Sequence, residues 1–314
     1  MFNIVEKRRW YFIVSGLLIL LGIAAMVVST ARFGAPVRLS IDFTGGSLFV
    51  LHFEGPADDA SIRAVFAEHG LSDVIVQRVQ RLGEQEENAW QVRTAEATSD
   101  QVQAILADLE AQIAPIDRDL LTYGTVSPVV GAEVTQAAGL AVAVASFIIL
   151  AFIWWSFRRV PHAFRYGAVA IIGMLHDILI ALGFYALMGI VRGWEVDALF
   201  LTAILTVSGF SVQDTIVVFD RIRENLPRYR GESFERVVNR SILETIHRSL
   251  ATQLNAIFVM VAIILFGGET IRPFIATMLV GMLSGTYSSI FIAVPLIVVW
   301  ERRTSRRASA QALA

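Results

Sequence analysis

The chain has 314 residues, of which 55% are apolar and only 17% charged, and its mean hydropathy is +0.60. Several apolar runs are long enough to cross roughly 30 Å of hydrocarbon, which takes about 20 helical residues. The composition therefore indicates a polytopic α-helical membrane protein. The chain contains no cysteine, which excludes disulfides and thiolate metal sites.

Hydropathy divides the chain into spanning and non-spanning parts. We expect six membrane-spanning helices, at residues 10–29, 136–157, 165–190, 196–219, 250–266 and 273–299. The first lies too far from a small-residue cleavage site to be a removable signal, so we interpret it as an uncleaved anchor. The remaining parts are an N-terminal stretch at 1–9, a segment at 30–135, a connection at 220–249 within the membrane region 136–299, and a tail at 300–314.

Basic residues are concentrated on one side of these predicted helices. Seventeen of them lie before the first helix, in the second-to-third and fourth-to-fifth connections, and in the tail, whereas the short opposite connections carry only Arg192 and Arg272. An excess of arginine and lysine in short loops marks the cytoplasmic side. We therefore expect both termini in the cytoplasm and the segment 30–135 outside it. That segment is acidic, which the rule tolerates because long domains are exempt.

The segment 30–135 has the pattern of a small soluble domain. Helices are expected at 58–69 and after Ser99, which we expect to cap the second helix. Alternating apolar residues predict strands at VRLSIDF and SLFVLHF, joined by a Thr44-Gly45-Gly46 turn, then at VIVQRVQRL and AWQVRT, joined by the turn GEQEEN, and finally at LLTYGTVS. The order β-α-β-β-α-β is typical of a ferredoxin-like α+β fold.

The connection 220–249 is charged and partly helical in its pattern. Its stretch FERVVNRSILETIHR places Val237, Ile242 and Ile246 among arginines. Such spacing predicts an amphipathic helix that lies in the membrane interface.

The fourth predicted helix contains a carboxylate, Asp214. It lies six residues before Asp220 and Arg221, where we expect the helix to reach water, so at 1.5 Å per residue it is roughly 9 Å deep. An ionised side chain there costs at least about 2.5 kcal/mol on insertion scales, and it needs a partner, a proton or a water-filled path. Ser208 and Ser211 are predicted to share its face of the helix. The alternative is a helix–helix hydrogen bond or ion pair without a transport role.

The fifth predicted helix carries a polar face, with Arg248, Thr252 and Asn255 at helical spacing and Gln253 adjacent. Helices four and five should be antiparallel neighbours, which makes Arg248 a candidate partner for Asp214. An incoming proton would break such a pair. The alternative is that Arg248 extends to the cytoplasmic edge of the membrane.

Two further ionisable residues, His176 and Asp177, lie midway along the third predicted helix. They could extend a proton path, bond to the fourth helix, or form a purely structural contact. A metal site is disfavoured because no further ligands cluster nearby. Close helix packing is predicted where small residues recur, at Gly281 and Gly285, continued by Ser284 and Ser288, and at Gly139 and Ala143.

Three motifs resemble the SecF family, the smaller membrane subunits of bacterial SecD–SecF complexes that assist protein secretion. They are Ile41-Asp42-Phe43-Thr44-Gly45-Gly46, Gly131-Ala132-Glu133, and SVQDTIVVFDRIREN, which contains Asp214, Asp220 and Arg221. The last is the most specific, and order and spacing agree along nearly the whole chain. Gln213 stands where the family pattern usually has asparagine, which keeps a polar amide in place.

The resemblance implies a six-helix half of an RND-type transporter in the bacterial inner membrane, without enzymatic activity. It implies that proton motive force drives movements of the outer domain that assist preprotein translocation, after or alongside the ATP-driven step. Asp214 and Arg248 match the residues implicated in proton use, and His176-Asp177 matches a similar polar pair. The implied partners are a SecD-like half, the SecYEG translocon, YajC, unfolded preprotein and membrane lipids, with no nucleic acid. The proton is the coupling ion, and neither a cofactor nor a metal is implied.

Other functions stay open at this point. An RND-type exporter half for small molecules or lipids would share the fold, and a passive translocon scaffold would share the partners. An intramembrane aspartyl protease is disfavoured, because Asp177 and Asp214 stand in HD and VQD rather than YD and GxGD contexts. The residue types alone suit H⁺ and Na⁺ equally.

Overall fold

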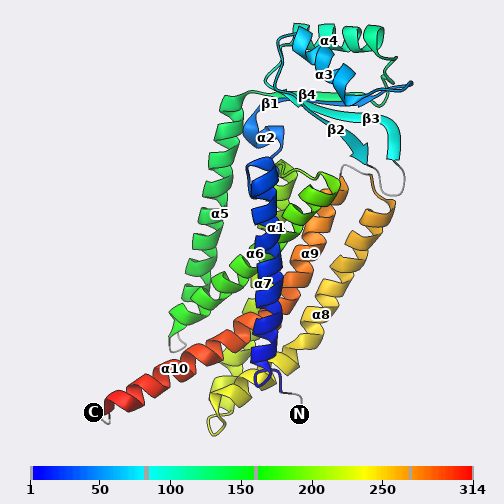
Figure 1. Ribbon diagram of the computed structural model, residues 1–314. Helices are drawn as coiled ribbons and strands as arrows, with labels where there is room; N and C mark the ends of the chain where they lie inside the picture. The colour runs from blue at the N-terminus through cyan, green and yellow to red at the C-terminus, as the bar shows by residue number, and fades with distance from the viewer. Residues whose placement is uncertain (1–2, 81–84, 159–161, 269–270, 313–314) are drawn as a thin grey trace. The chain divides into compact units, whose positions relative to one another are not determined.

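The computed structural model describes residues 3–80, 85–158, 162–268 and 271–312 (Figure 1). The chain forms two compact units. One comprises Met1–Arg38 and Leu140–Ala314, and the other is Leu39–Gly139. We call them the membrane unit and the outer unit.

The membrane unit is helical. Six stretches are long and apolar enough to cross a membrane, which confirms the predicted number of spans. The last of them, Arg272–Arg303, contains a π-helical turn, η2 (Ser289–Ala293), between two α-helices. The helices are α1 (Arg8–Phe33), α5 (Pro128–Ser156, in this unit from Leu140), α6 (Ala163–Arg192), α7 (Ala198–Arg228), α8 (Phe234–Phe266), α9 (Arg272–Ser288) and α10 (Val294–Ala312).

The predicted interfacial helix within 220–249 is wrong. Helix α7 continues to Arg228 and α8 already begins at Phe234, so the charged connection is the end of a helical hairpin. The apolar residues Val237, Val238 and Ile242 are buried rather than facing lipid, and the last two pack with Val218 and Ile222 of α7. An amphipathic pattern indicates only that one face of a helix is shielded from water. Here helix α7, rather than lipid, shields the apolar face of α8.

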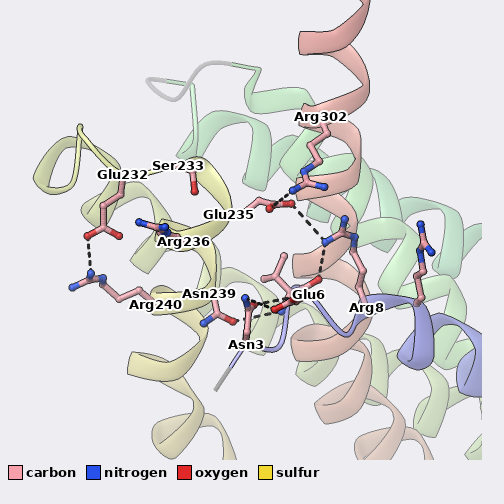
Figure 2. A pocket seen from close by; sticks show the side chains of 12 residues that line it. Asn3, Glu6, Arg8, Glu232, Ser233, Glu235, Arg236, Asn239, Arg240 and Arg302 are labelled. Carbon is pink, nitrogen blue, oxygen red and sulfur yellow. Dashed lines mark hydrogen bonds and ion pairs between the residues drawn. The ribbon is translucent and has the colours of Figure 1, made fainter. Parts of the chain in front are cut away.

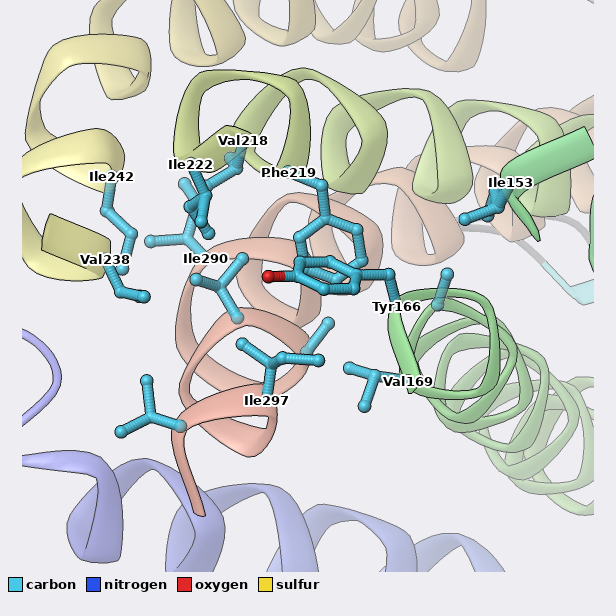
Figure 3. Close-up of a cluster of buried hydrophobic side chains, with 14 of the residues drawn as sticks. Ile153, Tyr166, Val169, Val218, Phe219, Ile222, Val238, Ile242, Ile290 and Ile297 are labelled. Atoms are coloured by element: carbon cyan, nitrogen blue, oxygen red, sulfur yellow. The ribbon is translucent and has the colours of Figure 1, made fainter. Parts of the chain in front are cut away.

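A large apolar cluster packs the helices around this hairpin (Figure 3). Tyr166 of α6 lies at its centre, stacked on Phe157 with ring centroids 5.5 Å apart and edge-on to Phe219 of α7 at 5.0 Å. Ile290 and Ile297, from η2 and α10, complete the contact. The C-terminal helix is thereby packed into the membrane unit together with α6, α7 and α8.

Small residues allow the closest helix contacts. A Cβ atom added at Gly281 of α9 would lie 2.5 Å from the side chain of Val207 on α7, and one at Gly183 of α6 would lie 2.5 Å from Gly22 Cα on α1. The predicted close packing at Gly281 is confirmed, whereas the contact with Gly22 was not predicted. The packing proposed for Gly139 and Ala143 stays a prediction.

The outer unit has the predicted β-α-β-β-α-β order and a ferredoxin-like topology. Its sheet has the order β2-β3-β1-β4, with every neighbouring pair antiparallel. Buried side chains of β1 and β3, including Phe49 and Val92, pack with Phe66 of α3 and Ile105 of α4 in one core. The elements are β1 (Gly46–His52), α3 (Asp59–Glu68), β2 (Ile75–Gln80), β3 (Gln85–Thr94), α4 (Ser99–Gln112) and β4 (Thr122–Val126).

Three local predictions for this unit need correction. Ile41–Thr44 forms a short helix, α2, instead of the end of a strand, because the side chain of Ser40 caps it by accepting from the amide of Asp42. Thr98, not Ser99, caps α4, in a reciprocal pair with Gln101. Of the predicted turn GEQEEN, residues 85–88 belong to β3, and 83–84 lie outside the described residues.

The two glycine-containing motifs of the outer unit pack against each other. Gly45 and Gly46 follow α2 with φ angles of 71° and 105°, which residues other than glycine rarely adopt. A Cβ atom at Gly45 would lie 2.5 Å from Pro128, and one at Gly131 would lie 2.8 Å from the carbonyl oxygen of Phe43. The motifs thus form a tight joint between α2, β1 and the first turn of α5.

Replacing Gly46 by alanine should destabilise the outer unit. The left-handed backbone costs a side chain roughly 1–2 kcal/mol, and the new Cβ would also lie 2.5 Å from the carbonyl oxygen of Thr94. Thermal unfolding and limited proteolysis of the full chain would detect the loss. Gly124→Ala on β4 is the matched control, because no described atom lies within 4 Å of its added Cβ. Equal stability of the two variants would contradict this account of the motif.

Candidate functional site

A fully buried carboxylate, Asp177, connects three helices of the membrane unit. Its side chain is 0% exposed. It accepts hydrogen bonds from Ser211 Oγ of α7 at 2.5 Å, and from Ser284 Oγ and Ser288 Oγ of α9 at 2.6 and 2.7 Å. Of the alternatives open for His176 and Asp177, the structure thus shows the bond to the fourth predicted helix.

His176 extends the same network towards α1. Its Nδ1 lies 2.9 Å from Asp177 Oδ1, and its Nε2 lies 2.5 Å from Ser15 Oγ. With the histidine, Asp177 has four hydrogen-bonding partners, which is the acceptor capacity of an ionised carboxylate. Both ring nitrogens are engaged, so either a neutral or a protonated imidazole satisfies the geometry.

Asp214 has fewer partners than Asp177. It is 5% exposed on α7, and Gln253 Nε2 of α8 donates to its Oδ2 at 2.8 Å. Ser249, one turn earlier on α8, is buried too, but its Oγ forms no hydrogen bond with a described residue. Its carboxyl group therefore has acceptor capacity to spare. The partner amide has spare capacity too, because Gln253 Oε1 is buried and bonds to no described residue.

The two carboxylates belong to one polar layer that crosses the bundle. Ser211, which bonds Asp177, and Asp214 are three positions apart on α7, so they lie on neighbouring parts of one helix face. Besides the tyrosines Tyr166 and Tyr185, the buried ionisable side chains in the described part of this unit are His176, Asp177 and Asp214. A single imidazole is thus the only buried group there that can carry a compensating positive charge.

The structure does not place Arg248 against Asp214. The Arg248 side chain is exposed, whereas Gln253 and Ser249 occupy the buried face of α8. The other members of the predicted polar face, Thr252 and Asn255, are exposed too, and Thr252 bonds back to the carbonyl oxygen of Arg248. The predicted polar face of α8 therefore exists, but its side chains lie on the surface of this chain and not against α7.

The remaining predicted polar residues of α7 also differ from expectation. Ser208 bonds the carbonyl oxygen of Ile204 on its own helix, and Ser211 bonds Asp177 rather than Asp214. Gln213 is exposed. These hydroxyl and amide groups therefore do not surround the Asp214 carboxyl group, although Ser211 joins it to the rest of the layer.

The charged end of the third motif stabilises the helical hairpin. Arg221 bonds Glu244 of α8 at 2.6 Å and Glu224 at 2.7 Å, and Asp220 pairs with Arg223 at 3.0 Å. Glu244 also accepts from Asn225 at 2.8 Å. These contacts lie beyond the buried layer. Arg221 joins α7 to α8, Asp220 pairs within α7, and neither bonds Asp214.

Sequence reasoning missed three partners in the layer. Ser284 and Ser288 were expected only to allow close packing, and Ser15 was not considered. Their signal was present, because Ser284 and Ser288 share one face of α9 at a spacing of four residues. A pair of hydroxyls on one face of a spanning helix predicts a polar acceptor on the neighbouring helix.

Two family models match the sequence. Residues 105–303 match the one described as "Protein export membrane protein SecD/SecF, C-terminal", and residues 33–57 match the "SecD/SecF GG Motif". The protein translocase subunits SecF of Anaerolinea thermophila and Thermobaculum terrenum are each 42% identical to the chain. Each alignment covers 96% of this chain, with 94% and 95% of the relative, respectively. The chain belongs to the SecF family of protein translocase subunits.

Two solved structures have the same fold. The crystal structure of SecDF from Thermus thermophilus, described as a translocon-associated membrane protein, is 28% identical with a TM-score of 0.77 over 96% of this chain. A second SecDF crystal structure is 29% identical, with a TM-score of 0.66 over 99%. This SecF-family chain spans about two fifths of those SecDF chains, 39% and 40%. The family and the six spans make it a multi-pass inner-membrane protein.

Removing one hydroxyl donor to Asp177 should destabilise the membrane unit. Ser288→Ala leaves a buried carboxylate with one hydrogen bond fewer, at a cost of about 1–3 kcal/mol. The neighbouring Ser289→Ala is the matched control, because Ser289 Oγ bonds the carbonyl oxygen of Thr286 on its own helical segment. Thermal unfolding in detergent would compare them. An equal loss of thermal stability in both variants would mean that the hydrogen bond to Asp177 stabilises the protein no more than a hydrogen bond within one helical segment.

Proposed function

We propose that this chain is the SecF half of a SecD–SecF-type complex that uses proton motive force to assist preprotein translocation. Asp214 is the group proposed to take up and release the proton. The observation that supports this role is its incomplete coordination in a buried layer, because Asp177 already has four donors whereas Asp214 depends on α8. A carboxyl group with unused acceptor sites can bind a proton without breaking other hydrogen bonds.

Gln253 suits both protonation states of Asp214. Its amide nitrogen donates to the carboxylate as observed. After a flip of the amide plane, the carbonyl oxygen of Gln253 would accept from a protonated carboxyl group. An amide carries no charge, so the proton would change the direction of a hydrogen bond rather than break an ion pair. The proposed proton site therefore differs from the Asp214–Arg248 pair that the sequence suggested.

The same bonds offer a route from protonation to movement. Asp214 and Gln253 join α7 to α8, and Ser211 joins α7 to α6 and α9 through Asp177. A change in the protonation of Asp214 alters its contact with Gln253, whereas the hydrogen bond between Ser211 and Asp177 is kept. In the proposed mechanism, this difference shifts α8 relative to the α6–α7–α9 core, and the shift is passed on to the outer unit.

The partners follow from the resemblance and from the relatives. The SecDF structures contain sequence beyond the part that this chain matches, which supports a SecD-like half as the missing partner. SecYEG, YajC and unfolded preprotein are proposed on the family resemblance alone, as are the cytoplasmic termini and the non-enzymatic role. Arg248, Thr252 and Asn255 are exposed in this chain, so any role of Arg248 in proton use would be exercised at the surface of α8.

Asp214→Asn should abolish proton-driven stimulation of preprotein translocation while leaving assembly intact. Asparagine keeps the size and the hydrogen bond to Gln253 but cannot exchange a proton. The measurement is preprotein uptake into membrane vesicles with and without a proton gradient, at matched expression. Asp220→Asn is the control, because that carboxylate is half-buried and pairs with Arg223 outside the layer. Persistent stimulation in Asp214→Asn would make Asp214 a structural hydrogen-bonding group and move the proton path to Asp177 or the partner subunit. Replacing the H⁺ gradient by a Na⁺ gradient identifies the coupling ion.

Gln253→Leu should reduce the same stimulation without preventing assembly. Leucine fills similar space but leaves Asp214 without its amide partner, which penalises the ionised form in a buried site. The pH at which stimulation is half-maximal should therefore rise. Asn255→Leu on the exposed face of α8 is the matched amide control. An unchanged pH profile in Gln253→Leu would remove Gln253 from the proposed site.

A further inference from the structure

A cavity of about 980 Å³ lies at the N-terminal end of the membrane unit (Figure 2). Residues before and at the start of α1 form one wall, the start of α8 forms another, and Arg302 of α10 closes it. Its volume is at the upper end of the range for ligand-binding pockets, about 300–1,000 Å³. The cavity is distinct from the buried polar layer, since none of the layer residues lines it.

The lining of this cavity is strongly charged and carries a positive excess. Five arginines and three glutamates contribute to it. The glutamates of α8 and its preceding turn are already paired: Glu232 with Arg240 at 2.7 Å, and Glu235 with Arg8 at 3.6 Å and with Arg302. These three arginines therefore share two glutamates, whereas the third glutamate of the lining, Glu6, accepts from Asn3 at 3.0 Å.

Two other arginines of the lining are not paired in this way. Arg9 of α1 and Arg236 of α8 are exposed, and neither forms an ion pair with a described residue. Ser233, which also lines the cavity, is the N-cap of α8 but makes no capping hydrogen bond with its side chain. The N-terminus of α8 with Arg236 in its first turn on one wall, and Arg9 on the wall formed by α1, favour an anion with several oxygen atoms, such as a phosphate.

The surface next to the cavity indicates that this anion carries apolar chains. From Arg9, one face of α1 continues at helical spacing through Ile13, Leu17 and Leu20, which are 53%, 56% and 62% exposed. Trp10, 70% exposed, follows Arg9 directly. Exposed tryptophan at the end of a spanning helix is typical of headgroup depth. The cavity and the stripe together match a molecule with a phosphate head and long hydrocarbon tails.

We propose that this cavity binds the phosphate headgroup of an anionic membrane phospholipid, with its acyl chains along the exposed stripe of α1. Arg236 and the N-terminus of α8 face the headgroup from one wall of the cavity, and Arg9 faces it from the wall formed by α1. Basic pockets between spanning helices bind anionic headgroups by this chemistry. The site joins α1, α8 and α10, so the lipid would also stabilise these three elements against one another.

The test is titration of the full chain in detergent with phosphatidylglycerol, followed by native mass spectrometry. Phosphatidylcholine is the zwitterionic reference, and inorganic phosphate and an acidic peptide are the competitors. The double variant Arg9→Gln with Arg236→Gln should bind phosphatidylglycerol roughly 25-fold more weakly, about fivefold for each arginine. Binding of phosphatidylcholine should be weak in both proteins and should not change.

The matched control removes the same charge elsewhere. Arg228→Gln with Arg230→Gln alters two exposed arginines of the hairpin that do not line the cavity, and it should keep phosphatidylglycerol binding within about twofold of wild type. Thermal unfolding shows that each variant is folded. Equal loss in both double variants would mean that only net charge matters and would overturn the site. Displacement of the lipid by inorganic phosphate would reassign it to a free anion, and displacement by the peptide to an acidic protein segment.

Discussion

The packing of the membrane unit depends on the hydrogen bonds to Asp177. A carboxylate that is 0% exposed inside an apolar bundle must be fully coordinated, because each missing donor costs the desolvation of a charge. The donors come from α6, α7 and α9, so the requirement fixes these helices in register. Gly285 makes the contact possible, since a side chain there would lie 3.2 Å from Ser211 Cβ and 3.6 Å from Asp177 Oδ2. The hydrogen bonds to Asp177 and the small side chain at Gly285 thus jointly fix how closely α6, α7 and α9 pack.

Much of the fold could be predicted because burial leaves a periodic trace in the sequence. Six apolar runs and the alternation of the outer segment were sufficient for six spans and the β-α-β-β-α-β order. Helix ends were harder, since α7 and α8 extend beyond the apolar region through charged residues that pack against each other, such as Arg221 and Glu244. The stretch before Gly45 alternates like a strand, yet Ile41–Thr44 forms a short helix that is capped where the amide of Asp42 donates to the side chain of Ser40.

The candidate site could be predicted only in part, for a geometric reason. A carboxylate in an apolar helix is visible in the sequence, so Asp214 and Asp177 were found without a structure. Their partners depend on how each neighbouring helix is rotated about its axis. Arg248 and Gln253 are five residues apart, which places them about 140° apart around α8 at 3.6 residues per turn. Packing against α7 selects the Gln253 face, and no pattern within α8 alone specifies that choice.

The identity of that partner changes what a proton would do in the proposed mechanism. With an arginine, neutralising Asp214 would leave a buried unpaired cation, so the pair would have to separate. With Gln253, both states of Asp214 can keep a hydrogen bond, and the difference between them is the orientation of one amide. Such a contact allows frequent proton exchange at low cost, but it yields little force by itself. The proposed shift of α8 then depends on this altered contact together with the altered charge of the layer, in which His176 is the only buried basic group of the described residues. Asp177, fixed by four partners, is the point against which α8 can shift.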